Sequence, residues 1–228
     1  MQGEAALNIT LPDKEDITRH AQGSFQIAQL LCHKLCVLAH VTETAAPLRA
    51  ITTSLNVAIE EVMVDLARQF KDAAVTFARG SKIRREGRAP YLHILRWLSE
   101  TEEWSIDLSD AVNVHADMKR SVEQVIDKGY LQALLSDPEK SDPLSPYFHY
   151  EPSTTVLSVE DPKLVFYLKN VIWRVFTLQV GYRADYFKGR YDFAFSFARP
   201  NRDLARTLHD LLTEREVVSF YDENEQHK

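Results

Sequence analysis

The sequence has few cysteines and few glycines for its length, with two Cys and seven Gly among 228 residues. Two cysteines cannot build the disulfide framework on which small secreted scaffolds depend. Cys32 and Cys36 are also separated by one turn of a predicted helix, which favours a reducing compartment over a secreted one. Seven glycines and nine prolines are too few for a low-complexity chain.

Long hydrophobic runs are also missing from the sequence. No run of about 18 apolar residues occurs, so we expect no membrane-spanning helix and no membrane partner. The N-terminus lacks the basic and apolar regions of a secretory signal. Together with the cysteine usage, these absences predict a cytoplasmic protein.

Positive charge is in deficit, because 27 Lys and Arg stand against 33 Asp and Glu, a net charge of −6. This balance argues against a protein that coats nucleic acid, so nucleic acid is not a favoured partner. One dense basic run, Lys82 to Arg88, could contact phosphates, although a solvated loop or a bridge to acidic neighbours is the interpretation we favour. The hydrophobic share of 45% is that of an ordinary globular chain of one or two domains.

The stretch from residue 188 to residue 228 predicts a strand, a helix and a second strand. Aromatic residues alternate with small or polar ones over Tyr191–Phe197, which is typical of a strand. Asn201 is a plausible N-cap for a helix. The helix carries leucines at helical spacing, at positions 204, 208, 211 and 212. Val217–Tyr221 is the second strand, and a helical crossover between two strands predicts that they are parallel neighbours.

Three segments of this stretch resemble the opening of a bacterial TIR domain. They are YDFAFSFA (residues 191–198), the Asn-Arg-Asp that starts the helix, and VSFYDENEQHK (residues 218–228). The resemblance implies a flavodoxin-like α/β fold, self-association through the TIR domain, and cleavage of NAD as a substrate at its nicotinamide–ribose bond. A carboxylate would stabilise the oxocarbenium-like centre of that reaction. TIR enzymes carry their catalytic glutamate on a later helix, so we expect no catalytic residue in this chain and no NAD hydrolysis by it alone.

A nucleotide site is expected beyond the carboxyl ends of the two strands, where open α/β sheets bind their ligands. The residues expected to line it are Phe197, Ala198, Arg199, Arg202 and Asp222. The helix N-terminus favours phosphate groups, and an arginine can hold a phosphate in a bidentate fork. Two alternatives stay open. Phe197 can point into the core of the sheet, and Arg202 can be a plain surface charge.

Residues 1–80 predict a helical region. A short strand is possible at Ala5–Leu11, and a helix that starts at Asp13 or Asp16 would end at Gly23. Ser24 is expected to cap the next helix, and a long helix is expected over Ser54–Ala78. Both have apolar residues at the spacing of a core-facing stripe.

The segment HAQGSFQIAQLLCHKLC, residues 20–36, resembles the helix in the lid of STAND-type and AAA-like P-loop ATPases. No GxxxxGK[ST] phosphate loop occurs in this chain, so ATP is implied only for a nucleotide-binding core upstream of Met1. Lids of this kind often offer an arginine to the nucleotide. Gln26 stands at the matching turn, which leaves that role in doubt.

Cys32, Cys36 and His40 would share one helical face, and thiolates and imidazole suit zinc. A structural zinc site normally draws ligands from two separate segments, whereas cysteine is also a common buried apolar residue. We therefore favour a core role and expect no metal site. Paired acids such as Glu102 and Glu103 are most simply solvated faces.

Residues 81–160 predict three short helices followed by a hairpin, which is the order of a winged helix. The helices are expected to begin at Pro90, to span Ser105–Val114, and to run from an Asp117 cap to Gly129; the strands are expected at Tyr130–Leu135 and Thr154–Val159. In a DNA-binding member the third helix enters the major groove. Here its face mixes Lys119 and Arg120 with Glu123 and Asp127, so we favour an internal packing module.

Residues 161–187 predict a connector helix, with Asp161 as N-cap, Pro162 in the first turn and Gly181 at the end. The segment resembles the connector that precedes TIR domains in some bacterial ATPase-TIR proteins. The whole chain is therefore expected to be mainly α, with a lid-like region and an α+β winged helix before the first βαβ unit of a flavodoxin-like TIR domain at residues 188–228.

The leading functional hypothesis is a bacterial signalling or defence protein with a regulatory ATPase-like part and a TIR effector. Two alternatives stay open: a winged-helix DNA-binding regulator, and a TIR scaffold that binds partners without catalysis. No Ser-His-Asp or Cys-His arrangement is defensible from the spacing of the eight histidines.

Overall fold

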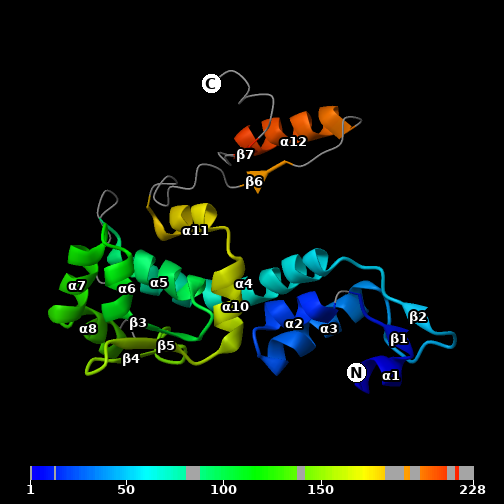
Figure 1. Cartoon of the computed structure of the whole chain (residues 1–228), viewed down its shortest axis with the longest axis horizontal. Coiled ribbons are helices and arrows are strands. Elements are labelled where there is room, and N and C mark those ends of the chain that lie inside the picture. Colours follow the sequence, from blue (N-terminus) through cyan, green and yellow to red (C-terminus); the bar gives the residue numbers. More distant parts are fainter. Residues whose placement is uncertain are drawn as a thin grey trace. The chain divides into compact units, whose positions relative to one another are not determined.

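The chain is mainly helical, which confirms the broad fold class expected from the sequence. The structure is a computed structural model and describes residues 2–12, 14–80, 88–137, 142–182, 193–195, 201–214 and 219–220. It divides into two compact units, Met1–Tyr182 and Arg183–Lys228, here called the helical unit and the C-terminal unit. Each is described by itself (Figure 1).

The elements of the helical unit follow one another in chain order. They are α1 (Gln2–Leu7), β1 (Ile9–Thr10), α2 (Lys14–Ala21), α3 (Phe25–Leu38), β2 (Arg49–Ala50), α4 (Leu55–Arg79), α5 (Pro90–Glu100), β3 (Ser105–Asp107), α6 (Leu108–Val114), α7 (Lys119–Asp127), α8 (Tyr130–Ser136), β4 (Phe148–Glu151), β5 (Val156–Val159), α10 (Pro162–Asn170) and α11 (Trp173–Val180).

The N-terminal region differs from its prediction at the first element. The strand expected at Ala5–Leu11 is confined to Ile9 and Thr10, because the Ala-rich residues before them form α1 and Asn8 ends that helix with a φ of 52°. β1 pairs in parallel with β2. The Ser24 cap is confirmed, since its hydroxyl accepts the N–H of Ile27 at 3.3 Å.

α4 is the long helix predicted from residue 54 onward, and it forms the centre of the helical unit. The Ser54 hydroxyl caps the helix by accepting the N–H of Asn56 at 3.3 Å. Val62, Phe70 and Phe77 on its apolar stripe have no exposed surface. Burying one such side chain contributes about 1.5–3 kcal/mol. α3, α5, α10 and α11 all pack against α4 (Figure 1).

Gly80 ends α4 in a conformation that only glycine tolerates well. Its φ is 62°, and its N–H donates to the carbonyl oxygens of Phe77 and Thr76. A Cβ atom at this position would also collide with the ring of Tyr91 at the start of α5. Gly80 therefore ends the helix one residue beyond Ala78, the end expected from the sequence.

β3 and the hairpin β4–β5, which follows α8, form a three-stranded antiparallel sheet in the order β3-β5-β4. Leu157 lies in its middle strand, opposite Ile106 on one side and Tyr150 on the other, and is fully buried. Phe148 of β4 stacks on Phe77 of α4 with ring centroids 4.5 Å apart. This stack fixes the sheet against the central helix.

One predicted element in this region is wrong. Tyr130–Leu135 belongs to helix α8 and not to a strand, and the strand that pairs with β5 in the hairpin is Phe148–Glu151. A short apolar run fits a helix as well as a strand, and here contacts with α7 and β4 decide for the helix. Gly129, with a φ of 66°, separates α7 from α8.

Two predicted boundaries also need correction. The helix expected over Ser105–Val114 begins only at Leu108, because the first three residues form β3 and Asp107 caps α6 by accepting the N–H of Ser109 at 2.8 Å. Asp117 does not cap α7, which begins at Lys119 after Met118.

The segment after β5 forms two helices where one was expected. Asp161 caps α10 as predicted, accepting the N–H of Lys163 at 2.9 Å. The helix stops at Asn170 because Val171 is extended, with a ψ of 143°, and α11 then runs to Gly181. The β-branched pair Val171–Ile172 disfavours continuation without forbidding it. Both helices pack on α4.

The C-terminal unit contains β6 (Phe193–Ala194), α12 (Arg202–Glu214) and β7 (Ser219–Phe220). β6 and β7 pair in parallel, with Phe193 opposite Ser219 and Ala194 opposite Phe220. The predicted strand, helix and parallel strand are therefore confirmed for the described residues. On α12, Ala205 is buried, whereas Leu204, Leu208 and Leu211 are 62%, 42% and 42% exposed.

Within the described ranges, no helix is both long enough and apolar enough to cross a bilayer. This agrees with the absence of long apolar runs in the sequence. The longest helix, α4, has exposed polar residues along one side, so its apolar stripe covers only the face toward the other helices.

Candidate functional site

The nucleotide site predicted from the sequence lies only partly within the described structure. Phe197, Ala198, Arg199 and Asp222 fall outside the described residues. Arg202 is the first residue of α12 and is exposed. The parallel pairing puts Ala194 beside Phe220, so the described carboxyl ends of both strands lie at one edge. This is the edge at which open α/β sheets bind ligands.

One polar contact in the C-terminal unit was not predicted. Nδ1 of His209 on α12 lies 2.7 Å from Oγ of Ser219 on β7. Ser219 is 6% exposed, and a hydrogen bond to a buried hydroxyl removes the cost of leaving that hydroxyl unpaired. The contact ties helix to strand. The sequence carries no local signal for it, because the two residues belong to different elements.

The cysteines of α3 lie in an environment that suppresses thiolate formation. Burial raises the pKa of Cys36, and burial, Cys36 and Glu4 together raise the pKa of Cys32. In the part of the chain that the structure describes, no three His, Cys, Asp or Glu side chains gather as a metal-binding group. Cys36 packs as a buried apolar residue at 8% exposure.

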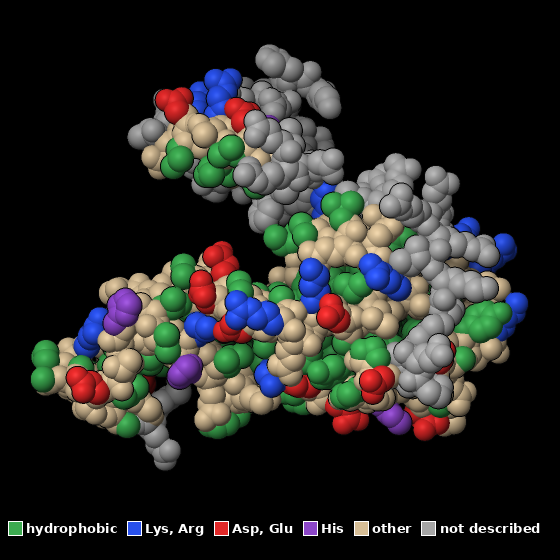
Figure 2. Space-filling view, turned by 180° about the vertical axis from the view of Figure 1, so that it is seen from behind, with side chains coloured by type: hydrophobic (Ala, Val, Ile, Leu, Met, Phe, Trp, Pro, Cys, Tyr) green, Lys and Arg blue, Asp and Glu red, His purple; other side chains and the backbone are tan. Residues whose placement is uncertain are grey.

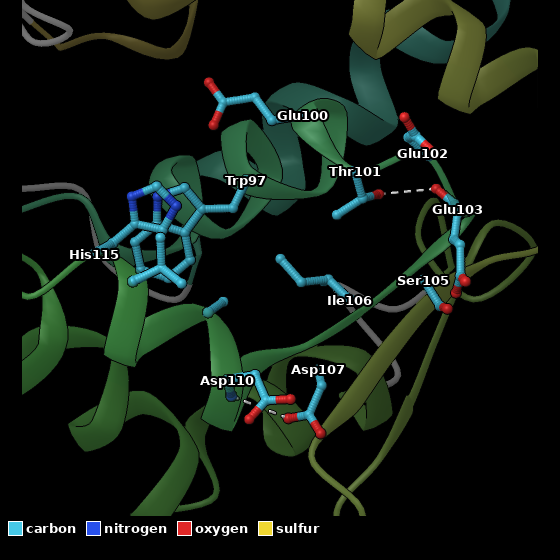
Figure 3. Close-up of a pocket in the computed structure, with 12 residues that line it drawn as sticks. Trp97, Glu100, Thr101, Glu102, Glu103, Ser105, Ile106, Asp107, Asp110 and His115 are labelled. Atoms are coloured by element: carbon cyan, nitrogen blue, oxygen red, sulfur yellow. Dashed lines mark hydrogen bonds between the residues drawn. The ribbon is translucent and has the colours of Figure 1, made fainter.

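The helical unit carries a groove that the sequence did not reveal, here called the acidic groove. It has a volume of about 410 Å³ and lies between the end of α5, β3 and α6 (Figure 3). Its apolar floor includes Trp97, Ile106 and Ala111. The ring of His115 stacks on Trp97 with centroids 4.5 Å apart and planes 6° from parallel. The carboxylates that give the groove its name are Glu100, Glu102, Glu103, Asp107 and Asp110.

Two of these carboxylates have partners that hold them in place. Glu100 Oε1 lies 2.6 Å from Nε of Arg96, one helical turn earlier. Asp107 Oδ1 accepts the N–H of Ser109 at 2.8 Å and the hydroxyl of Thr155 at 3.0 Å. Asp107 therefore caps α6 and also holds the turn between β4 and β5 in place.

The far wall of the groove is organised by Thr101 and Lys169. The Thr101 hydroxyl lies 2.8 Å from the carbonyl oxygen of Glu103, and Nζ of Lys169 donates to the carbonyl oxygen of Thr101. Burial lowers the pKa of Lys169, while the nearby carboxylate of Glu102 opposes that shift. The loop from Thr101 to Glu103 is thereby held in one conformation at the mouth of the groove.

His93, one turn before Trp97 on α5, is half-buried and does not line the groove. Burial lowers its pKa to about 4, Asp117 opposes the shift, and His115 adds to it. The His93 and Trp97 rings lie 6.2 Å apart. His93 is therefore neutral at pH 7 and acts there as a packing residue.

The sequence contained only a partial signal for the acidic groove. The run Glu100, Glu102 and Glu103 is visible, and acids of this kind were interpreted as a solvated face. The sequence gives no sign of the groove's floor, because Trp97 and His115 meet only through the packing of α5 against α7 and β3.

Comparison with protein-family models, with curated proteins and with solved structures gives no match to this chain.

Proposed function

We propose that this chain is part of a bacterial TIR-domain signalling or defence protein, in which a lid-like and winged-helix part regulates a TIR effector that cleaves NAD. The single observation that carries the proposal is the parallel pairing of β6 with β7 around α12. This βαβ unit is the opening expected of a flavodoxin-like fold. The TIR-like motifs at residues 191–198 and 218–228 include these two strands.

The order of elements between residues 88 and 160 supports the winged-helix part of the proposal. A helix, a strand, further helices and a hairpin follow one another, and the first strand pairs with the last in the order β3-β5-β4. A winged helix has this arrangement of a short first strand beside a hairpin. α8 is an additional helix before the hairpin.

The charges of this region favour an internal module over a DNA reader. Nζ of Lys119 on α7 donates to Asn113 at 2.9 Å and lies 3.6 Å from Glu123. The hairpin sequence from residue 148 to residue 159 contains Glu151 and no Lys or Arg. Figure 2 shows basic and acidic side chains interspersed on the visible face. DNA binding depends on clustered positive charge, which this arrangement lacks.

The helices α2, α3 and α4 support the lid-like assignment of residues 1–80. The ATPase-like motif begins at the end of α2 and continues into α3, whose buried stripe of Ile27, Leu31 and Leu35 packs on α4. In the proposed protein, ATP binds to a domain upstream of these helices and their movement gathers the TIR domains. Self-association through those domains then switches on NAD cleavage.

Within this proposal, the phosphates of NAD lie at the N-terminus of α12. Arg202 begins that helix, and Arg199 precedes it in the chain. Fixed positive charge at a helix N-terminus favours an anionic ligand, and an arginine adds directional donors. Phe197, Ala198 and Asp222 complete the proposed pocket.

The test measures nicotinamide release by the protein that contains this chain and a complete TIR domain. Arg199→Ala and Arg202→Ala should each lower turnover by about tenfold or more, the loss expected for a hydrogen bond to a charged group. Arg206→Ala, one turn further along α12, is the matched control and should retain turnover. Melting temperatures of all three variants should stay close to that of the unmodified protein.

Two results would contradict the proposal in different ways. Wild-type turnover in both Arg199→Ala and Arg202→Ala would show that the pocket lies elsewhere. No nicotinamide release from the intact protein while its TIR domains still associate would favour the non-catalytic scaffold.

A further inference from the structure

The acidic groove of the helical unit has no role in the proposed NAD chemistry, and the inference drawn from it does not depend on that proposal. Figure 3 shows the aromatic and acidic side chains of the groove arranged around Ile106. Trp97 and His115 lie on one side, Glu102 and Glu103 on another, and Asp107 and Asp110 on a third.

The groove is apolar at its base. Trp97 is 4% exposed, and Ile106 and Ala111 are each 8% exposed, so the floor is preformed by packed side chains. Val114 belongs to the same lining and is 78% exposed, so it adds accessible apolar surface to the groove. An apolar base with polar groups around it is typical of a site that takes up a side chain of another molecule.

The rim of the groove has an excess of negative charge. Arg96 is already paired with Glu100, and Lys169 is directed to a backbone carbonyl. Among the described residues, no Lys, Arg or His side chain forms an ion pair with Glu102, Glu103 or Asp110, and all three are exposed. Lys169 lies near Glu102, so a cationic ligand would meet the carboxylates of Glu103 and Asp110 with the least competition from neighbouring charges.

We propose that the acidic groove binds a Lys- or Arg-bearing peptide segment of a partner protein, with one apolar side chain over Trp97 and Ile106 and cationic side chains at Glu103 and Asp110. Charge complementarity selects the partner, and the apolar floor anchors it. A volume of about 410 Å³ holds a few side chains and not a folded domain. Nucleic acid is repelled by the same carboxylates.

The test titrates the full 228-residue chain into dye-labelled twelve-residue peptides and follows fluorescence anisotropy at low and at physiological salt. One peptide combines Lys and Leu, a second replaces Leu by Ser, and a third replaces Lys by Glu. The Lys-Leu peptide should bind most tightly. The Lys-Ser peptide should bind about tenfold more weakly because it lacks the apolar anchor, and the Glu-Leu peptide should not bind.

Matched variants separate the groove from general charge attraction. Glu103→Gln combined with Asp110→Asn should weaken binding of the Lys-Leu peptide by about tenfold or more. Glu60→Gln combined with Glu61→Gln removes the same charge from an exposed part of α4 and should change binding less than about twofold. All four positions are exposed, so folding should be retained, and a circular dichroism spectrum checks this.

Three outcomes would overturn the proposal. Equal weakening by both double variants would show attraction to the overall charge, and equal binding of the Lys-Leu and Lys-Ser peptides would show that the floor is not used. If no peptide binds but the chain self-associates in a manner lost in the Glu103→Gln, Asp110→Asn variant, the occupant is a second copy and not a partner protein. Sedimentation velocity of the same samples makes that distinction.

Discussion

Arg79 at the end of α4 donates from Nε to the carbonyl oxygen of Val180 at the end of α11, at a distance of 3.1 Å. A second donor of the same guanidinium reaches the carbonyl oxygen of Gln179 at 3.2 Å. The last carbonyls of a helix have no partner within the helix. Arg79 supplies that partner across 101 positions of sequence and joins the ends of two helices near the boundary of the helical unit.

Replacing Arg79 by alanine should therefore lower the free energy of unfolding by about 1 kcal/mol. This is less than the loss expected for a buried hydrogen bond to a charged group, because Arg79 is exposed to solvent. Arg68→Ala is the matched control on the same helix, since Arg68 contacts only Asp65 in an exposed pair at 3.4 Å. Urea denaturation of both variants provides the measurement. An equal effect of the two substitutions would show that the link to α11 contributes nothing.

Glu4 should make the N-terminal region sensitive to acid. Its carboxylate accepts the N–H of Leu11 and pairs with Lys14, each at 2.9 Å, and these contacts lower its pKa from 4.5 to about 2. The pKa is lower in the folded state, so this stabilisation is complete above pH 4.5 and is lost as the pH falls toward 2. Glu4→Gln should lower the free energy of unfolding at pH 7 by about 1–2 kcal/mol.

The check on Glu4 is the pH dependence of the difference between the variant and the unmodified chain. Denaturation at pH 7, 5, 4 and 2.5 should show a constant difference between pH 7 and 5 and a shrinking difference over the two lower steps. A difference that stays constant across this range would mean that the carboxylate's charge has no part in it.

The cap predicted at Asp117 is wrong, since α7 begins at Lys119 after Met118, whereas the caps predicted at Ser24 and Asp161 are confirmed. In these two cases the hydroxyl or carboxylate reaches a backbone N–H two or three residues away. The interaction is local, so nothing elsewhere in the chain has to be known. The parallel pairing of β6 with β7 was also predictable, because the sequence places a helix between two segments that are rich in aromatic residues.

The elements that were missed depend on distant contacts. Phe148 belongs to a strand because it pairs with Val159 and stacks on Phe77, more than seventy residues before it in the chain. The extended Val171 interrupts an otherwise continuous helical pattern with neither Gly nor Pro. Tertiary packing decides both cases, and periodicity cannot report it.

The acidic groove likewise combines features that are visible in the local sequence with features that depend on distant contacts. Its acids stand in one short segment and are visible in the sequence, whereas its floor needs Trp97 on α5 and His115 beyond α6 to meet face to face. The nucleotide site was predicted only through the rule that ligands bind at strand ends, and of its five residues Arg202 is the one that the structure describes.

His93 should make the helical unit less stable as the pH falls through a higher window. Burial lowers its pKa from 6.5 to about 4. Between pH 6.5 and pH 4, His93 is therefore protonated in the unfolded chain but mostly neutral in the folded chain. Its contribution is intact above pH 6.5 and is lost as the pH falls toward 4, with a slope of at most about 1.4 kcal/mol per pH unit. His115 and Asp117 are the titratable neighbours that modulate it.

Substituting His93 by glutamine should remove that slope. Denaturation at pH 7.5, 5.5 and 4.5 should show the variant losing less stability than the unmodified chain over this interval. Glu4→Gln serves as the control, because Glu4 titrates in a lower window. A parallel pH dependence of the His93→Gln variant and the unmodified chain would exclude His93 as the source.

Thr155 holds the turn between β4 and β5 in a strained conformation. Its φ is 56°, in the left-handed region that a β-branched residue avoids at a cost of about 1–2 kcal/mol. Its hydroxyl lies 3.0 Å from Asp107 Oδ1 and 2.7 Å from Ser109 Oγ, and its carbonyl oxygen accepts the N–H of Leu108. These contacts offset the strain and fix the turn against the start of α6.

Thr155→Val retains the strain and removes both hydroxyl contacts, so it should lower the free energy of unfolding by about 1–2 kcal/mol. Thr154→Val is the matched control, because the Thr154 hydroxyl makes only a long contact of 3.5 Å with the Glu151 carbonyl oxygen. Thr155→Gly also loses the hydroxyl but releases the strain, and should therefore destabilise less than Thr155→Val. Urea denaturation ranks the three variants. If Thr155→Gly is the most destabilising, strain at this turn does not contribute as argued.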